Sequence, residues 1–365
     1  MSKSRKVQLE KKIMIFLSSG VFIFSGLYAS NVQAAPVFSS GIASDSTVAG
    51  VNNTASANSS SAFGYFNTAG GLASSAFGWS NTASAENASA FGYVNEASGL
   101  ASSALGFRNK AANENASAVG YGNNAGGVAS SAFGFSNVAK VDYASAFGYS
   151  NEASGLASSA VGFRNKAASE NASAVGYGNN ANALAASAVG YNNTAGGVGS
   201  STIGYNNTAT NENASAFGYG NTAGGLASSA FGFSNTASGD NANAFGYNNI
   251  ASGSKSNVFG TGNTVSGSSS NAVGTANEVA AENSTAIGNN NTISAGAENS
   301  AALGNNISIS LKDSVALGNN STATAINSVT GNSSYTKWAG VSDVVGVVSV
   351  GSSGATRQIQ NVAAG

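Results

Sequence analysis

The chain has 365 residues, of which only 8 % are charged, 48 are glycine, and none is cysteine or histidine. Without cysteine there are no disulfide cross-links or thiolates, and without histidine the commonest general base and metal ligand is missing. Hydrophobic residues make up 42 %, too many for a solvated glycine-rich linker, so the composition indicates a folded chain with little scope for enzymatic chemistry.

Residues 1–34 have the pattern of an export signal. A basic N-terminal stretch precedes an apolar run over residues 13–27, and Val32-Gln33-Ala34 offers a small-residue cleavage site. A single membrane anchor is the alternative, which we disfavour because Ser18, Ser19 and Gly20 interrupt a run already shorter than the roughly 20 residues a spanning helix needs.

The charge of the exported chain argues against one class of partner. The signal segment holds five of the 14 basic residues but only one of the 15 acidic residues, so the remaining chain is mildly acidic. It contains no basic stripe that could displace the counterions of phosphates, and we expect no nucleic-acid partner.

A fourteen-residue repeat dominates the chain. Glycine recurs every fourteen residues from Gly50 to Gly288, each preceded by an apolar or small residue and followed three positions later by Asn; the repeat continues through Gly304, after a two-residue insertion, and through Gly318. A fixed period this short indicates a solenoid. The sequence therefore predicts an all-β solenoid over residues 48–326, after an irregular lead-in at 35–47 and before a different region at 327–365.

Each coil is predicted to contain two short strands and two tight turns. One strand, such as Ala73–Gly78, ends on a large apolar residue before the glycine, and the other passes through a small residue such as Ala69. Gly and Asn are expected wherever φ is positive. Ordering fourteen residues costs on the order of 20 kcal/mol, whereas one large apolar residue and two or three alanines return only a few kcal/mol by buried area. Coils must therefore stack, and we expect several chains to associate side by side to complete the core.

In such a stack, residues fourteen apart form columns. The Asn column from Asn53 to Asn291 is predicted to be a structural hydrogen-bonded ladder. The residue after each glycine is aromatic in fourteen consecutive coils, and these rings either cover the groove between chains or form an amphipathic surface for an elongated ligand. This aromatic column consists of Tyr65, Trp79, Tyr93, Phe107, Tyr121, Phe135, Tyr149, Phe163, Tyr177, Tyr191, Tyr205, Tyr219, Phe233 and Tyr247.

Charged residues follow the same period. Glu96 precedes Lys110 by one coil, Glu152 precedes Lys166 likewise, and the 56-residue spacing of the two pairs indicates an internal duplication. We expect exposed ion pairs on a solvated face, each contributing at most about 1 kcal/mol. No phosphate-binding loop, calcium-binding repeat or acidic cluster with metal-ligand spacing is recognisable, so we expect no catalytic residue, cofactor or metal.

The coils resemble the head repeats of trimeric autotransporter adhesins of the YadA type, most clearly at Ser314-Val315-Ala316-Leu317-Gly318. The segment from Val348 to Gly365, with Arg357, Gln358 and Asn361, resembles the neck that follows such heads. The resemblance implies a left-handed parallel β-roll, or β-helix, in a side-by-side homotrimer whose neck crosses between protomers. Such proteins continue into a coiled-coil stalk and an outer-membrane anchor. We recognise neither here, and therefore expect 327–365 to be a neck-like region truncated before the stalk.

These features together predict a non-enzymatic adhesin head at the bacterial surface, with itself, extracellular-matrix proteins, host-surface proteins or other bacteria as partners. Contact with the membrane would come only through the missing C-terminal anchor. A structural spacer without its own ligand is the main alternative. An ice-binding solenoid would present a regular Thr array, but the column that starts at Thr68 and Thr82 continues as Glu96 and Lys110. An enzyme is the least favoured alternative.

Overall fold

The computed structural model describes residues 15–17, 20–22, 39–326 and 345–361. The first two segments are β1 (Ile15–Leu17) and β2 (Gly20–Phe22), which pair antiparallel. The other residues of the predicted export signal, including its cleavage site, lie outside the described residues. All secondary structure in the described segments is β, which confirms the predicted class, and none of their residues forms a helix long and apolar enough to cross a membrane.

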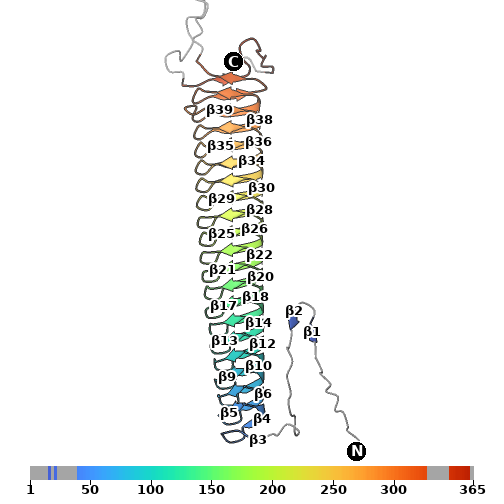
Figure 1. Ribbon diagram of the computed structural model, residues 1–365. Coiled ribbons are helices and arrows are strands. Elements are labelled where there is room, and N and C mark those ends of the chain that lie inside the picture. Colours follow the sequence, from blue (N-terminus) through green and yellow to red (C-terminus); the bar gives the residue numbers. More distant parts are fainter. Residues whose placement is uncertain (1–14, 18–19, 23–38, 327–344, 362–365) are drawn as a thin grey trace, which may run out of the picture.

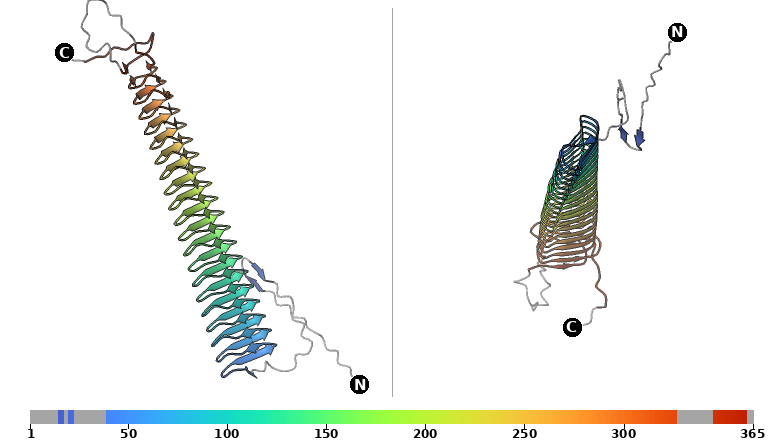
Figure 2. Two further views of the ribbon diagram at one scale, coloured as in Figure 1. Left: turned by 90° about the vertical axis from the view of Figure 1, so that its left-hand side faces the viewer. Right: turned by 90° about the horizontal axis from the view of Figure 1, so that it is seen from below.

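The repeats form a long rod of stacked coils (Figures 1 and 2). Each complete coil contributes one long and one short strand, and each strand pairs in parallel with its equivalents in the neighbouring coils, for example Ser61 with Ser75 and Thr68 with Thr82. A register of fourteen residues is kept from β4 to β38, and it becomes sixteen between β38 and β40 because of the two-residue insertion. The predicted parallel solenoid of fourteen-residue coils is confirmed, whereas the left-handed coiling and the trimer stay predictions.

The long strands form one sheet along the rod. They are β4 (Thr47–Val51), β6 (Ser61–Tyr65), β8 (Ser75–Trp79), β10 (Ser89–Tyr93), β12 (Ser103–Phe107), β14 (Ser117–Tyr121), β16 (Ser131–Phe135), β18 (Ser145–Tyr149), β20 (Ser159–Phe163), β22 (Ser173–Tyr177), β24 (Ser187–Tyr191), β26 (Ser201–Tyr205), β28 (Ser215–Tyr219), β30 (Ser229–Phe233), β32 (Asn243–Tyr247), β34 (Asn257–Thr261), β36 (Asn271–Thr275), β38 (Thr285–Asn289), β40 (Ala301–Asn305) and β42 (Val315–Leu317).

The short strands form the second sheet. They are β5 (Thr54–Ala55), β7 (Thr68–Ala69), β9 (Thr82–Ala83), β11 (Glu96–Ala97), β13 (Lys110–Ala111), β15 (Asn124–Ala125), β17 (Val138–Ala139), β19 (Glu152–Ala153), β21 (Lys166–Ala167), β23 (Asn180–Ala181), β25 (Thr194–Ala195), β27 (Thr208–Ala209), β29 (Thr222–Ala223), β31 (Thr236–Ala237), β33 (Ile250–Ala251), β35 (Thr264–Val265), β37 (Glu278–Val279), β39 (Thr292–Ile293), β41 (Ser308–Ile309) and β43 (Thr322–Ala323).

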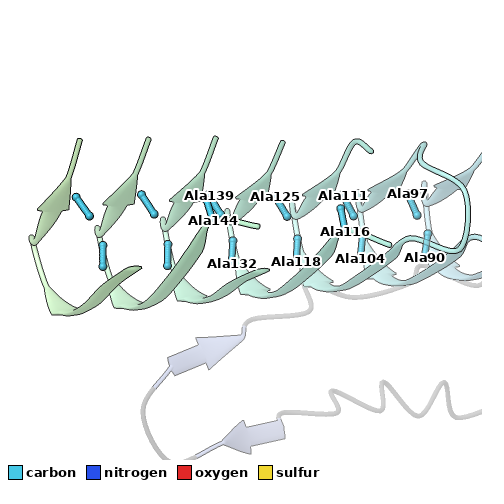
Figure 3. Packing of buried hydrophobic residues seen from close by; sticks show 14 of the residues in the cluster. Ala90, Ala97, Ala104, Ala111, Ala116, Ala118, Ala125, Ala132, Ala139 and Ala144 are labelled. Carbon is cyan, nitrogen blue, oxygen red and sulfur yellow. The ribbon is translucent and has the colours of Figure 1, made fainter. Parts of the chain in front are cut away.

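The core between the two sheets is built almost entirely of alanine (Figure 3). Ala62 on a long strand and Ala69 on a short strand are both fully buried, and their equivalents repeat along the rod, with valine and isoleucine appearing only in the last coils. The large apolar residue before each glycine was expected to belong to this core, but it points outward. Side chains alternate along a strand, so burying Ala62 places Phe63 on the opposite face of the sheet.

The residue types with positive φ in the turns differ from the expectation, which was Gly and Asn only. Two corners of each coil have φ near 55°, and they are occupied by diverse residues such as Phe66 (φ 58°), Ala73 (φ 53°) and Arg108 (φ 54°) as well as by Gly and Asn. Closing a coil in fourteen residues requires these left-handed corners whatever the side chain, and bulky residues there carry conformational strain.

Both ends of the stack extend beyond the predicted repeats. At the N-terminal end, β3 (Ser39–Ser40), within the predicted irregular lead-in, pairs antiparallel with β4. At the C-terminal end, β44 (Val348–Ser349) pairs in parallel with β42, Val315 facing Val348. The repeat was expected to stop after Ile326, and this additional strand was missed because residues 327–344, which lie outside the described residues, separate it from the regular spacing.

Candidate functional site

The glycine column fixes the register that brings equivalent side chains together. Gly64 has φ of 118°, and a Cβ atom there would lie 2.1 Å from the carbonyl oxygen of Gly78 in the next coil. The same contact recurs along the rod, so a side chain is excluded at this position by both backbone conformation and space. Adjacent coils are thereby held close, and side chains at one coil position stack directly over one another.

The asparagine ladder is structural, as predicted. Asn67 is fully buried, and its Nδ2 donates to Asn53 Oδ1 (2.9 Å), to the carbonyl of Phe63 (2.8 Å) and to the carbonyl of Gly78 (2.7 Å). Its Oδ1 accepts from the backbone N–H and from Nδ2 of Asn81. These bonds recur to Asn291, whose Oδ1 accepts from the N–H of Ile307. The ladder therefore has no free groups to offer a ligand.

Two apolar columns lie on the outer face of the long-strand sheet. The first, called here the apolar column, is the residue before each glycine and consists of Phe63, Phe77, Phe91, Leu105, Val119, Phe133, Phe147, Val161, Val175, Val189, Ile203, Phe217, Phe231, Phe245, Phe259, Val273, Ile287, Leu303 and Leu317. The second is the aromatic column, two residues further along each strand and therefore on the same face. Members of both columns are half-buried or exposed in the single chain, up to 52 % for Leu303 in the apolar column and 54 % for Tyr247 in the aromatic column.

The structure brings all fourteen residues of the aromatic column into one continuous stack. From Tyr93 to Tyr247 successive ring centroids lie 4.7–5.1 Å apart with interplanar angles of at most 10°. The spacing equals the distance between paired strands, about 4.8 Å. Because each ring covers the face of the next, the column presents ring edges and phenol hydroxyls to its surroundings, not ring faces.

The first members of the column are less regular. Tyr65 and Trp79 lie 4.3 Å apart at 33°, and Trp79 and Tyr93 are 6.2 Å apart. Phe66, at a left-handed corner, packs edge-on against the ring of Tyr65. The indole is wider than a phenyl ring, and it disrupts the regular stacking at the N-terminal end of the rod.

The two columns end at different places. The aromatic column stops at Tyr247 and is followed by Thr261 and Thr275, and then by asparagines that form an external amide ladder. In that ladder Asn289 Nδ2 donates to Asn305 Oδ1 at 2.7 Å. The apolar column, in contrast, continues to Leu317. The outer face of the same sheet therefore carries two apolar columns along most of the rod and only one in its last coils.

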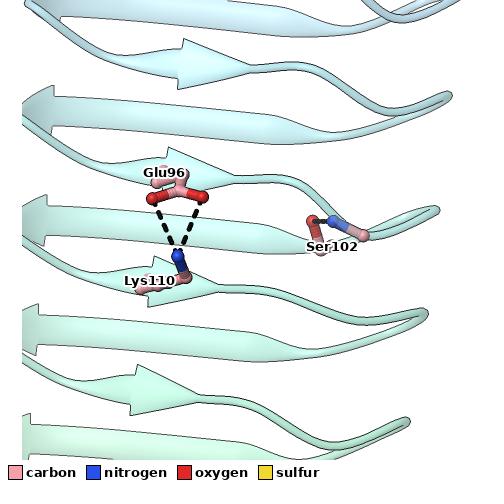
Figure 4. Close-up of polar contacts among 4 residues, drawn as sticks. Glu96, Ser102 and Lys110 are labelled. Atoms are coloured by element: carbon pink, nitrogen blue, oxygen red, sulfur yellow. Dashed lines mark hydrogen bonds and ion pairs between the residues drawn. The ribbon is translucent and has the colours of Figure 1, made fainter.

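The predicted ion pairs are present on the short-strand sheet. Lys110 Nζ lies 3.1 Å from Glu96 Oε1 (Figure 4), and Lys166 Nζ lies 3.9 Å from Glu152 Oε2. All four side chains are about half exposed, so the pairs are worth at most about 1 kcal/mol each. Among the described residues, no group of three or more acidic side chains could hold a metal ion.

Sequence reasoning overlooked two arginines beside the aromatic column. The guanidinium carbon of Arg108 lies beside the ring of Phe107, 5.2 Å from its centroid, and that of Arg164 lies beside the ring of Phe163 at 5.1 Å. Both arginines belong to the segment duplicated at 56 residues, and the duplication was the signal that could have revealed them.

The predicted neck residues separate into one that contacts the stack and two that do not. Arg357 donates from Nη1 to Ser321 Oγ (3.1 Å) and to the carbonyl of Val350 (2.8 Å), and from Nη2 to the carbonyl of Asn319. It thereby caps carbonyl groups at the C-terminal end of the stack, while Gln358 and Asn361 are exposed.

Fold and side chains define an elongated, non-globular repeat protein that displays continuous columns of side chains. The family described as YadA head domain repeat (2 copies) matches residues 42–67, 69–94, 97–123, 125–151, 153–179, 195–221, 223–249, 266–291 and 312–329, which is more than half of the chain. The chain therefore belongs to the YadA head family and is a head of the trimeric autotransporter adhesin type. A comparison with curated proteins found no match.

Proposed function

We propose that this chain is the non-enzymatic head of a bacterial surface adhesin that acts as a homotrimer after export. Its targets are extracellular-matrix proteins, host-cell surface proteins or other bacteria. Attachment by a rod of repeated coils is multivalent: many weak contacts act together because the first contact raises the effective concentration of the others.

The apolar column supports the trimer. It runs along the whole rod on an outward face, although most coils bury only alanine, serine and asparagine. A continuous exposed apolar face of this length is typical of an interaction surface. Side-by-side chains that cover it would supply the hydrophobic burial that a single coil lacks.

One observation carries the assignment of the aromatic column as the binding surface. If its rings served only to cover the groove between chains, they would be needed wherever the chains associate, down to the last coils. The aromatic column instead stops at Tyr247, while the apolar column continues to Leu317. The rings thus serve a purpose confined to the N-terminal part of the rod, and tyrosine is enriched at protein recognition surfaces.

The experiment replaces Tyr177, Tyr191, Tyr205 and Tyr219 together by Ser and measures attachment to immobilised matrix proteins and to cultured cells. The matched control replaces Thr194, Thr208, Thr222 and Thr236, on the short-strand sheet of the same region, by Ser. We expect the tyrosine variant to lose attachment while the threonine variant keeps it. Undiminished attachment of a folded tyrosine variant would instead favour the spacer function.

A further inference from the structure

Arg108 and Arg164 are free cations held in matching surroundings. Both side chains are exposed, and each guanidinium lies beside the aromatic ring of the preceding residue. Neither side chain has a carboxylate or hydrogen-bond partner among the described residues. The nearby lysines are different, because Lys110 and Lys166 are paired with Glu96 and Glu152. The net positive charge of each site therefore comes from its arginine.

The fold does not require these arginines. Both occupy left-handed corners, with φ of 54° and 53°, where an arginine is strained and a glycine is not. The coil that lies 56 residues beyond Arg164 has Gly220 at the corresponding position, with Thr222 and Thr208 in place of the lysine and the glutamate. The coil thus forms without the charges, which indicates that they serve contacts outside the coil.

The two sites are placed for a ligand that lies along the rod. They are four coils apart on the same corner of the coil, or about 19 Å at the strand spacing of about 4.8 Å. Between them runs the aromatic column, in which Tyr121 and Tyr149 are 36 % and 40 % exposed and carry phenol hydroxyls.

We infer that the aromatic column binds a linear anionic polysaccharide, with Arg108 and Arg164 each holding one carboxylate or sulfate group. Guanidinium binds such oxyanions through paired N–H donors, and hydroxyls match a sugar chain. An acidic peptide fits less well, because an extended peptide binds best to an open sheet edge, whereas the long strands from β6 to β40 are paired on both sides. This inference deepens the proposed function and rests on it.

The test measures binding of heparin oligosaccharides to the full chain at two salt concentrations. One oligosaccharide is shorter than the separation of about 19 Å between Arg108 and Arg164, and the other is longer. The variants are Arg108→Gly, Arg164→Gly and the double variant, whose glycines suit the left-handed corners and leave folding intact. Lys255→Asn, at another left-handed corner, removes the same charge at a distance and serves as control.

Each single variant should weaken the longer oligosaccharide at least about 10-fold, because bivalent attachment is lost. For the shorter one it should halve the number of sites and leave the affinity unchanged. The double variant should bind neither, and the wild-type affinity should fall with salt. Equal losses in Lys255→Asn, unchanged binding in the double variant, or equal binding of poly-glutamate would each overturn the inference. If tyrosine variants lose attachment to cells while arginine variants keep it, the proposed function stands and only this inference fails.

Discussion

The asparagine ladder offers the sharpest test of what holds the coils together, because Asn123 and Asn124 are neighbours in sequence with opposite surroundings. Asn123 is 1 % exposed, and its Nδ2 donates to Asn109 Oδ1 (3.0 Å) and to the carbonyls of Val119 (2.9 Å) and Gly134 (2.7 Å). Its Oδ1 accepts from the N–H of Asn137 at 3.0 Å. Asn124 points outward from β15 and is exposed.

Replacing Asn123 by Ala leaves three backbone groups without these partners: the carbonyls of Val119 and Gly134 and the N–H of Asn137. At about 1–2 kcal/mol for each buried unsatisfied group, the local stack should lose about 3–6 kcal/mol. At about 1.4 kcal/mol per factor of ten, this is a rise of roughly 10²–10⁴ in local opening. The Asn124→Ala change should stay within about 0.5 kcal/mol, as surface substitutions do.

Native-state hydrogen exchange measures this directly, because protection is read separately for each coil and does not require the long rod to unfold in one step. We expect Asn123→Ala to reduce protection in its own and the adjacent coils, and distant coils to keep theirs. Equal protection in the Asn123→Ala and Asn124→Ala proteins would refute the reasoning, since the ladder would then contribute nothing that water cannot replace.

Three further predictions concern other columns. Gly134→Ala places a Cβ 2.1 Å from the carbonyl oxygen of Gly148 at φ of 117°, so thermal unfolding by circular dichroism should show a loss above about 3 kcal/mol. Gly122→Asn, at φ of 63° with its nearest neighbour at 3.6 Å, should be tolerated in the same assay. Val161→Asp should convert the trimer to a folded monomer in sedimentation, whereas Thr194→Asp on the short-strand sheet should not; a trimeric Val161→Asp protein would place the interface elsewhere. Glu96→Gln should change stability by at most about 1 kcal/mol, because the pair with Lys110 is exposed.

Much of this architecture could be predicted because the residues that determine it recur in every coil. Gly64 and Asn67 recur with every coil, so their period gave the solenoid, the register and the ladder. The inside and outside of the long strand could not be assigned in the same way. In Ala62-Phe63-Gly64-Tyr65 the larger residues suggest a core, but alternation permits either face to be buried, and the structure buries the face that carries Ala62. The two arginines could not be recognised in this way, because they are 56 residues apart and do not recur with the fourteen-residue period.

The outward columns indicate where the rod makes contacts with other molecules, which the composition of the core does not. A coil that buries only small residues and asparagine tolerates almost any outward side chain, and the column facing out from the short strands uses this freedom, passing from Thr82 to Glu96, Lys110, Asn124 and Val138 in consecutive coils. Ring stacking contributes about 0.5–1.5 kcal/mol per pair. That gain was equally available after Tyr247, where the column turns polar. A column that stays aromatic for fourteen coils and then stops is therefore better explained by contacts outside the coil, and the limits of each column mark where those contacts begin and end.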